Sequence, residues 1–304
     1  MKQSSISIIL LNWNGCNETI QCIKMLQKID YKNYKIILVD NGSRDDSVKI
    51  LKEKFPNIDM ITIEHNKGFS GGANVGMQYA LKNKPEYILL LNNDAKVKHN
   101  FLSELVKVAE SNKKIGIVGS MVYYQNNKRL IQSAGGYKNF KGLYPFKGPY
   151  QDKIDNGQFK KNILVDTMSG CSMLIKREVI EKIGMLDENH FIYAEDIDFC
   201  VRAKKAGYLL YTAVKSKVWH KVSASSGGRE KNLTFLYYNT RNLIYFSKKH
   251  LKFNEKIIYN FYYLFGRLCT VGKFFLQGEY KPVQAILIGI IHGYIGRMGS
   301  YQLK

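Results

Sequence analysis

Short apolar runs alternate with helix-like stretches over roughly the first 125 residues of the chain. The runs read ISIILLN, KIILVD, DMITIEH, EYILLLNND and IGIVGSMVY. The stretches between them have the composition of helices and cover residues 17–29, 45–55, 72–83 and 100–112. Strands that alternate with helices form α/β domains with a mainly parallel sheet, and nearly continuous apolar strands indicate helices on both faces of that sheet. The pattern therefore predicts a Rossmann-like α/β domain.

Polar residues close three of these runs. Asn12 to Asn14 follow the first run, Asp40 and Asn41 end the second, and Asn92 to Asp94 end the fourth. Open α/β sheets bind their ligands beyond the carboxyl ends of the strands. We therefore expect these polar residues to line a ligand crevice.

Two motifs each leave a functional and a structural interpretation open. In LVDNGSRDDS, Asp40 either accepts hydrogen bonds from a ribose hydroxyl or a base N–H, or belongs to a common turn before a helix. In EHNKGFSGGANVG, the glycines surround a helix start, where free N–H groups favour anions. The motif matches neither GxGxxG nor GxxxxGK[ST], so a simple helix cap is its alternative. Its glycines are Gly68, Gly71, Gly72 and Gly76.

The end of the fourth run carries side chains that suit a divalent cation. Asn92, Asn93 and Asp94 offer oxygen ligands of the kind that bind a hard cation, which in turn grips a diphosphate. A capped loop is the structural alternative. His220, beside Trp219 at the end of a later strand-like run, is either a metal ligand or a structural histidine.

The stretch FIYAEDIDFC places three carboxylates among aromatic and aliphatic residues. These are Glu195, Asp196 and Asp198. Buried carboxylates are costly unless they are paired, bound to metal or used for proton transfer. The stretch is therefore either a helix start or a reaction site.

Composition limits the kinds of partner and compartment. The net charge of +21 requires an anionic partner, and nucleic acid, nucleotide-like substrates and acidic lipid surfaces all qualify. The five cysteines form no CxxC pair, which argues against a zinc knuckle or a disulfide framework and favours a reducing compartment. The apolar run near the N-terminus covers only Ile6 to Leu11, so we expect a first strand, no signal peptide and a cytoplasmic protein.

The remaining sequence divides into an irregular segment and a tail. Residues 123–161 are rich in Gly, Tyr, Lys and Asn, and we expect a long segment without secondary structure over the site. In the tail, IIYNFYYLFGRLCTVGKFFL and VQAILIGIIHGYIGRMG are apolar but interrupted, too short for spanning helices. An excess of Lys and Arg predicts helices lying in an anionic membrane interface. The alternatives are packing on the core or a homodimer face, and the predicted division is 1–245 and 246–304.

Eight motifs in order give the chain a specific resemblance over residues 5–245. Taken together it resembles the family-two glycosyltransferases, inverting enzymes of the GT-A fold, and especially the rhamnosyltransferase-like bacterial members that build surface polysaccharides. The motifs are IILLNWNG, LVDNGSRDDS, NKGFSGGANVG, LLLNNDAKV, SGCSMLIKREVIEKIGMLDE, FIYAEDIDFCVRAKKAGY, VWH and YYNTRN. The resemblance implies a GT-A domain, Rossmann-like, with a mixed and mainly parallel sheet, helices on both faces and a C-terminal helical segment.

The resemblance also implies a donor side. A nucleoside-diphosphate sugar would lie across the crevice, with Asp40 at the base and ribose and the backbone of Asn14 beside it. Asn92, Asn93 and Asp94 occupy the place of the family's DxD motif, of which only the last acid is present. Asp94 would bind Mg²⁺ or Mn²⁺, and His220 would be the second protein ligand. The remaining implied donor contacts are Asn41, Gly68, Gly71 and Asn74.

On the acceptor side, small residues such as Gly170 and Ser172 would let the sugar approach the backbone. Asp196 resembles the family's general base and Glu195 its helper. Asp198 is expected to cap the following helix or to pair with Arg202 four residues later.

These expectations combine into one predicted function. The protein would transfer one sugar, rhamnose or another hexose, from the nucleotide sugar to a hydroxyl of a saccharide acceptor, lipid-linked, in cell-surface polysaccharide or cell-wall synthesis. It would act on the inner face of the plasma membrane. Three rivals are a nucleotidyltransferase, which would want a basic glycine-rich loop after the first strand, a basic nucleic-acid-binding protein, and an inactive structural homologue. The basic residues are spread along the chain, which argues against nucleic acid.

Overall fold

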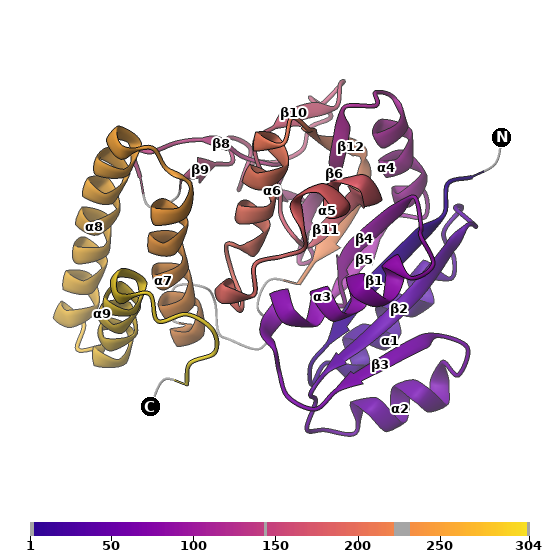
Figure 1. Ribbon diagram of the computed structural model, residues 1–304, viewed down its shortest axis with the longest axis horizontal. Helices are drawn as coiled ribbons and strands as arrows, with labels where there is room; N and C mark the ends of the chain where they lie inside the picture. Colours follow the sequence, from indigo (N-terminus) through magenta and orange to yellow (C-terminus); the bar gives the residue numbers. More distant parts are fainter. Residues whose placement is uncertain (1–2, 143–144, 222–231, 303–304) are drawn as a thin grey trace.

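The computed structural model describes residues 3–142, 145–221 and 232–302. A central mixed sheet runs through the larger part of the molecule (Figure 1), in the order β10-β12-β6-β11-β4-β1-β2-β3. Six of these strands point the same way, while β11 and β10 oppose them. Two further strands, β5 and β7, are added antiparallel to β12 and β6. The predicted mixed, mainly parallel sheet is confirmed.

The strands agree with the apolar runs in the sequence. The five predicted runs become β1, β2, β3, β4 and β6. The strands of the sheet are β1 (Ile6–Asn12), β2 (Tyr34–Asn41), β3 (Asp59–Ile63), β4 (Tyr87–Asn92), β5 (Ala95–Val97), β6 (Ile115–Tyr124), β7 (Asn127–Ser133), β10 (Ile163–Val165), β11 (Ser172–Lys176) and β12 (Leu209–His220).

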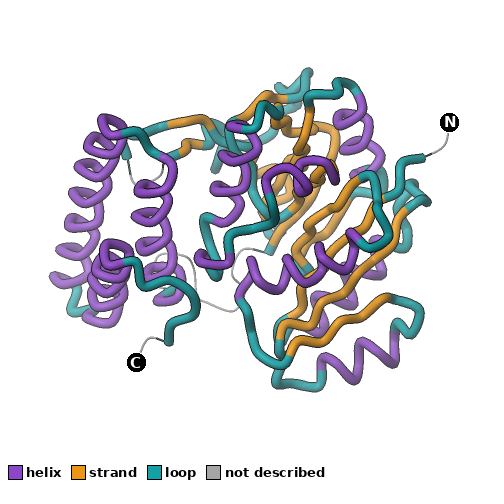
Figure 2. The backbone as a smooth tube through the Cα atoms, viewed as in Figure 1, coloured by secondary structure: helices purple, strands orange, loops and turns teal. Residues whose placement is uncertain are grey.

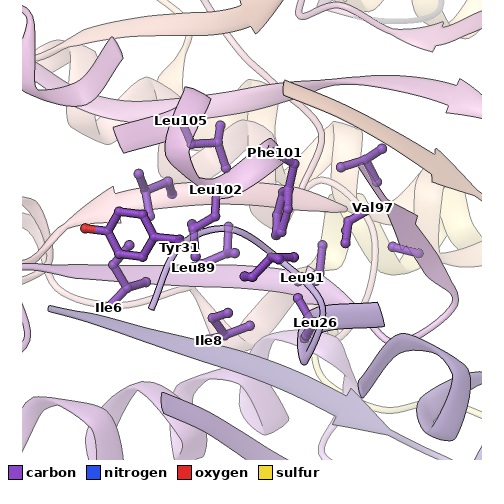
Figure 3. Packing of buried hydrophobic residues seen from close by; sticks show 14 of the residues in the cluster. Ile6, Ile8, Leu26, Tyr31, Leu89, Leu91, Val97, Phe101, Leu102 and Leu105 are labelled. Atoms are coloured by element: carbon purple, nitrogen blue, oxygen red, sulfur yellow. The ribbon is translucent and has the colours of Figure 1, made fainter. Parts of the chain in front are cut away.

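Helices cover both faces of the sheet because alternate strand residues point to opposite faces. In β1, Ile8 and Leu10 join one buried cluster, and Ile9 joins another. The first cluster, shown in Figure 3, packs Ile8, Leu89 and Leu91 against helical residues such as Phe101 and Leu102. The helices of this domain are α1 (Cys16–Leu26), α2 (Ser47–Lys54), α3 (Gly68–Leu81), α4 (Phe101–Glu110), α5 (Arg177–Ile183) and α6 (Glu195–Lys205).

Helix α3 begins four residues before its predicted start at residue 72 because its glycines lie inside the helix. A Cβ on Gly72 would lie 2.5 Å from Leu11 Cδ1, and a Cβ on Gly76 would lie 2.6 Å from Ile9 Cγ2. Only glycine lets the helix approach β1 this closely. Gly72 and Gly76 therefore serve helix–sheet packing.

The expectation that residues 123–161 lack secondary structure is wrong. β7 pairs with β6, and β8 (Tyr137–Lys138) pairs with β9 (Phe146–Lys147) as a separate two-stranded sheet. The ring of Phe146 lies edge-on to Phe246, with centroids 6.0 Å apart, and Lys138 forms an ion pair with Glu255. This segment therefore contacts the C-terminal helices.

Three C-terminal helices pack together beside the sheet domain (Figures 1 and 2). They are α7 (Leu233–His250), α8 (Phe253–Leu276) and α9 (Tyr280–Ile295). The expected division after residue 245 falls inside α7, which is continuous to His250. We propose instead that the helical region begins with α7. Within the described residues, no helix has the length and apolarity needed to span a bilayer.

A buried carboxylate joins α6 to α7. Asp198 is 0% exposed, and its oxygens lie 2.7 Å from Arg202 Nε, 2.7 Å from Lys249 Nζ and 2.6 Å from His250 Nε2. Burial would raise the pKa of Asp198, but its hydrogen bonds to basic groups, including His250 and Lys249, hold that pKa well below its usual range. The predicted pairing with Arg202 is confirmed. Asp198 does not cap the helix, because α6 already starts at Glu195.

We expect Asp198→Asn to lower the free energy of unfolding by about 3 kcal/mol at pH 7, because the basic side chains around this buried carboxylate lose their counter-ion. Since the folded-state pKa lies below that of the unfolded chain, the native protein loses this stabilisation as the pH falls below about 4. Urea unfolding at pH 7 and at pH 3 tests both statements. A difference that is below about 1 kcal/mol at pH 7, or that grows in acid, would contradict this role.

Packing of α9 on α7 also depends on a close approach. A Cβ on Gly289 would lie 2.8 Å from the carbonyl oxygen of Tyr237, whereas a Cβ on Gly272 of α8 would meet nothing within 4 Å. We expect Gly289→Ala to destabilise the protein by about 1–3 kcal/mol through overpacking. The matched variant Gly272→Ala should stabilise it by about 0.5–1 kcal/mol. Urea midpoints that shift in the same direction for both variants would disprove the packing argument.

Candidate active site

The carboxyl ends of β1, β2 and β4 meet at one edge of the sheet. In the strand register Asn12 lies beside Asp40, and Leu11 lies beside Asn92. The polar strand ends identified in the sequence are therefore neighbours in space. They form the donor side of the candidate site.

Asp40 is 1% exposed and holds the turn after β2. Its Oδ2 accepts from Asn12 Nδ2 at 2.8 Å and from Ser43 Oγ at 2.7 Å, and its Oδ1 accepts from the Ser43 backbone N–H at 2.9 Å. Ser43 Oγ in turn accepts from the N–H of Asn14, which is exposed and has a φ of 50°. Through Ser43, the Asp40 carboxylate therefore fixes the backbone of Asn14 at the carboxyl edge of the sheet.

Asn41 and Asn74 bind protein groups around α3. Asn41 Nδ2 donates to Gly68 O at 2.9 Å, and its Oδ1 accepts from the N–H of Lys67. Asn74 exchanges two hydrogen bonds with the backbone of Leu186, at 2.9 and 3.0 Å. Both amides therefore hold backbone groups around α3 in place.

Glycines let the start of α3 meet the segment before α6. Gly68 has a φ of +72°, and a Cβ there would lie 2.2 Å from the carbonyl oxygen of Phe191, which accepts from the Ser70 N–H. A Cβ on Gly71 would lie 2.7 Å from Lys67 Cβ. The close approach at Gly68 brings the donor-side helix directly against the segment that carries the acidic motif.

The structure brings Asp94 and His220 together although 126 positions separate them. β5 pairs with β12, so Ala95 lies opposite His220. His220 Nε2 lies 3.2 Å from Asp94 Oδ1 and 3.1 Å from Asn92 Nδ2. Asn93 turns away and donates to Thr19 Oγ1 at 2.8 Å.

The hydrogen bonds of His220 suit a metal ligand. Its Nδ1 lies 3.0 Å from Gln132 Oε1, and an amide oxygen can only accept, so Nδ1 carries a proton. In the neutral ring, Nε2 then carries the lone pair, which both Asn92 Nδ2 and Asp94 Oδ1 approach, at 3.1 and 3.2 Å. Two such groups facing each other match the donor set of a divalent cation, and a histidine ligand commonly donates its second N–H to a carbonyl.

A cluster of Asp187, His190 and Asp198 also has metal-like spacing. Lys249 Nζ lies 2.5 Å from Asp187 Oδ2 and 2.7 Å from Asp198 Oδ1. Lys249 already bridges both carboxylates, and Asp198 also pairs with Arg202 and His250, so the cations of this cluster are protein side chains and it does not fit a metal.

Asp196 and Glu195 start α6 as a coupled acidic pair. Asp196 is partly exposed, and its Oδ2 accepts from the Gly170 N–H at 2.9 Å. Burial raises the pKa of Asp196, although backbone N–H groups of Gly170 and Ile197 oppose that rise. Burial and the charge of Asp196 raise the pKa of Glu195 well above its usual range. Of the two carboxyl groups, Glu195 is therefore the one whose charged form is more strongly disfavoured.

Small residues connect the two sides of the site, but only in part as expected. Gly170 contacts Asp196, and the next carbonyl, that of Cys171, accepts from the Asn92 N–H at 3.0 Å. Ser172 is 1% exposed, and its hydroxyl lies 2.7 Å from Ser120 Oγ inside the sheet. The structure therefore does not bring Ser172 to a surface that an acceptor can reach.

Two residues that the sequence reasoning missed hold the segment before the acidic pair. Asn242 Nδ2 lies 2.8 Å from the carbonyl oxygens of His190, Ile192 and Tyr193. Arg241, which is 0% exposed, donates to the carbonyls of Asn189, His190 and Gly299. Both belong to the YYNTRN motif, whose polar residues inside an aromatic helix were the available signal.

The held segment is strained. Phe191, Tyr193 and Ala194 have φ values of 61°, 69° and 68°. Such conformations are uncommon for residues other than glycine, cost about 1–3 kcal/mol each and cluster at functional sites. The strain lies directly before Glu195 and Asp196, where it sets the direction in which α6 starts.

Residues 7–184, more than half of the chain, match the sequence profile described as Glycosyl transferase family 2. The chain is 23% identical over 230 residues to the dTDP-rhamnosyl transferase RfbF of Shigella flexneri, covering 73% of this chain and 71% of that protein. It is 21% identical over 240 residues to an N-acetylglucosaminyl-diphospho-decaprenol L-rhamnosyltransferase of Mycobacterium tuberculosis, covering 71% and 75%.

A solved structure supports the same fold. The mannosyltransferase PcManGT from Pyrobaculum calidifontis, in complex with GDP-Man and Mn²⁺, superposes with a TM-score of 0.59 at 14% identity, covering 99% of this chain and 77% of that one. The predicted GT-A fold is confirmed, and so is the resemblance noted in the sequence. The chain belongs to glycosyl transferase family 2.

Proposed function

We propose that this protein transfers one sugar, rhamnose or another hexose, from a nucleoside-diphosphate sugar to a hydroxyl of a lipid-linked saccharide, with inversion at the anomeric carbon. The reaction would contribute to cell-surface polysaccharide or cell-wall synthesis in the cytoplasm, at the inner face of the plasma membrane. The observation that carries the proposal is that Asp196, bonded to Gly170, and the facing pair of Asp94 and His220 are connected through Cys171, whose carbonyl accepts from the Asn92 N–H. The names of both rhamnosyltransferase relatives and the decaprenol-linked acceptor of one of them support this substrate class.

The donor side would bind the nucleotide sugar. The Asn14 backbone, fixed through Ser43 by Asp40, would meet the base and ribose. Asp94 and His220 would hold Mg²⁺ or Mn²⁺, which when bound neutralises the charge that develops on the leaving diphosphate. Asn92 supports His220 from the same strand end.

The acceptor side would supply the base. Asp196 would accept the proton of the acceptor hydroxyl as that oxygen attacks the anomeric carbon, and a single displacement inverts the centre. Both Asp196 oxygens accept a backbone N–H, Oδ2 from Gly170 at 2.9 Å and Oδ1 from Ile197 at 2.8 Å, and these bonds orient the carboxylate that would take the hydroxyl proton. Glu195, whose pKa is raised by burial and by the charge of Asp196, would support the base.

Asp94→Ala is expected to weaken Mn²⁺-dependent binding of the nucleotide sugar by more than about tenfold, because residues that only support a metal ligand already contribute about 10- to 100-fold. Calorimetric titration with Mn²⁺ and with EDTA measures this, and the exposed Glu53→Ala on α2 is the matched control. Equal donor affinity in the native protein and Asp94→Ala, with Mn²⁺ present, would refute the metal assignment.

Asp196→Asn is expected to lower the single-turnover transfer rate by about 10²- to 10⁴-fold with little change in donor affinity, because the amide cannot accept the proton. Glu195→Gln keeps the shape of the side chain and leaves the proposed base in place, so it should retain most of the activity. In the native protein the rate should fall as the pH drops below the raised pKa of Asp196, since protonation removes the base. Loss of activity in Glu195→Gln with Asp196→Asn active would reverse the two assignments.

A further inference from the structure

Helix α8 presents an almost uncharged face to solvent. Among its exposed residues the only charged side chain is that of Lys273. The other exposed residues are Phe253, Asn254, Ile257, Ile258, Phe261, Tyr262, Phe265, Leu268, Cys269, Phe275 and Leu276. A helix on the surface of a globular protein normally turns polar and charged residues outward. The face of α8 therefore resembles a surface that is covered in use.

Helix α9 extends this surface. Among the residues that the structure describes, eighteen large apolar side chains are exposed, and fourteen of them lie on α8 or α9. Those on α9 are Tyr280, Leu287, Ile291, Tyr294 and Ile295, with exposures of 39–68%. Single exposed apolar residues are ordinary, but a concentration of this kind marks an interaction site. We call the exposed apolar residues of α8 and α9 the apolar face.

The opposite side of α8 is packed on protein. Tyr259, Tyr263 and Phe274 are buried, and Tyr263 OH donates to the carbonyl of Thr240 on α7 at 3.1 Å. Lipid therefore cannot surround α8, and a lipid contact would have to be one-sided. A 24-residue helix is about 36 Å long, enough to lie along a bilayer surface.

Charge decides between a bilayer and a second copy of the chain. From Lys248 onward the sequence has nine Lys or Arg residues against two glutamates, and the whole chain carries +21. Lys252, Lys281 and Arg297 are exposed near the ends of α8 and α9. Two copies of such a basic chain would repel each other, whereas anionic lipid would neutralise the basic side chains. Tyrosines at the face also suit the headgroup level of a membrane.

We propose that the apolar face lies in the interface of an anionic bilayer, with α8 parallel to the membrane plane and the surrounding basic residues on lipid phosphates. Aromatic and aliphatic side chains would enter the boundary between headgroups and acyl chains, as in amphipathic helices that bind membranes. This binding needs neither the nucleotide sugar nor the acceptor.

The test uses the purified full-length protein and vesicles of phosphatidylcholine with or without phosphatidylglycerol. A triple variant, Phe261→Gln with Phe265→Gln and Leu268→Gln, removes the middle of the apolar face, where exposures are 68%, 62% and 59%. The control replaces Ile154 and Leu164, exposed apolar residues away from these helices, by Gln. Urea midpoints and circular dichroism establish that both variants are folded.

We expect the native protein and the control to float with phosphatidylglycerol vesicles, and less with pure phosphatidylcholine. Loss of one apolar contact weakens partitioning by up to about tenfold, so the triple variant should bind about 100-fold more weakly. Equal flotation of the native protein and the triple variant would overturn the proposal. A native dimer in light scattering that becomes a monomer in the triple variant, with no flotation of either, would assign the face to a second copy.

Because flotation contains no sugar donor, its failure would leave the proposed transfer reaction untouched. Conversely, an inactive Asp94→Ala or Asp196→Asn variant should still float like the native protein. Loss of flotation in those variants would show that membrane binding depends on the active site, and would also overturn the proposal.

Discussion

The position of the acidic pair, Glu195 and Asp196, depends on backbone carbonyl groups that accept hydrogen bonds from helix α7. Asn242 and Arg241 donate hydrogen bonds to backbone carbonyls within residues 189–193. In this segment Phe191, Tyr193 and Ala194 have uncommon positive φ values just before Glu195. Carbonyl oxygens buried without donors would cost free energy, and positive φ values add strain. The amide of Asn242 and the guanidinium of Arg241 offset both costs, because each offers several N–H donors in a fixed geometry. The direction of α6, and hence of Asp196, follows from this contact.

This dependence makes the C-terminal helices part of the catalytic structure. Helix α7 also contributes Lys249 and His250, which pair with Asp198. Asp198 lies three residues after the start of α6. Two separate contacts therefore tie α7 to the acidic motif, one to its preceding segment and one to its first turn. When one side of a helical bundle supports a site, the other side of the bundle can make other contacts. In this chain that other side carries the apolar face of α8 and α9.

The residues of the donor side are positioned by a different interaction, the backbone pairing of strands. Parallel strands bring Asn12, Asp40 and Asn92 to one edge of the sheet, and strand β5 carries Asp94 on to His220 of β12. These residues are positioned by the backbone ladder, which is rigid and buried. The backbone bonds Asn92–Cys171 and Gly170–Asp196 lie on adjacent residues of one segment, so they connect the donor edge to the acceptor side. A displacement of this segment would move Asn92 and Asp196 together.

Sequence alone determined the parts of this protein that depend on local pattern. Apolar periodicity predicted five sheet strands and the helices between them, strand-end polarity predicted polar residues gathered at the carboxyl edge of the sheet, and the spacing of Asp198 and Arg202 predicted their ion pair. Such features are encoded within a few residues, as strand alternation and helix spacing are. The roles of Asp196, Asp94 and His220 were accessible only through the ordered motifs of the family.

Tertiary structure decided the features that join distant segments. Asn242 and Arg241 hold residues about fifty positions earlier, Asp198 gains Lys249 and His250, and Ser172 is enclosed by Ser120 within the sheet. The strands of residues 123–161 form against β6 and against each other, in a composition that predicts none. For the tail, sequence could not choose between packing and membrane contact, because an apolar helix serves either use. Only the folded chain shows that one side of α8 is buried on α7 and α9 while the other faces outward.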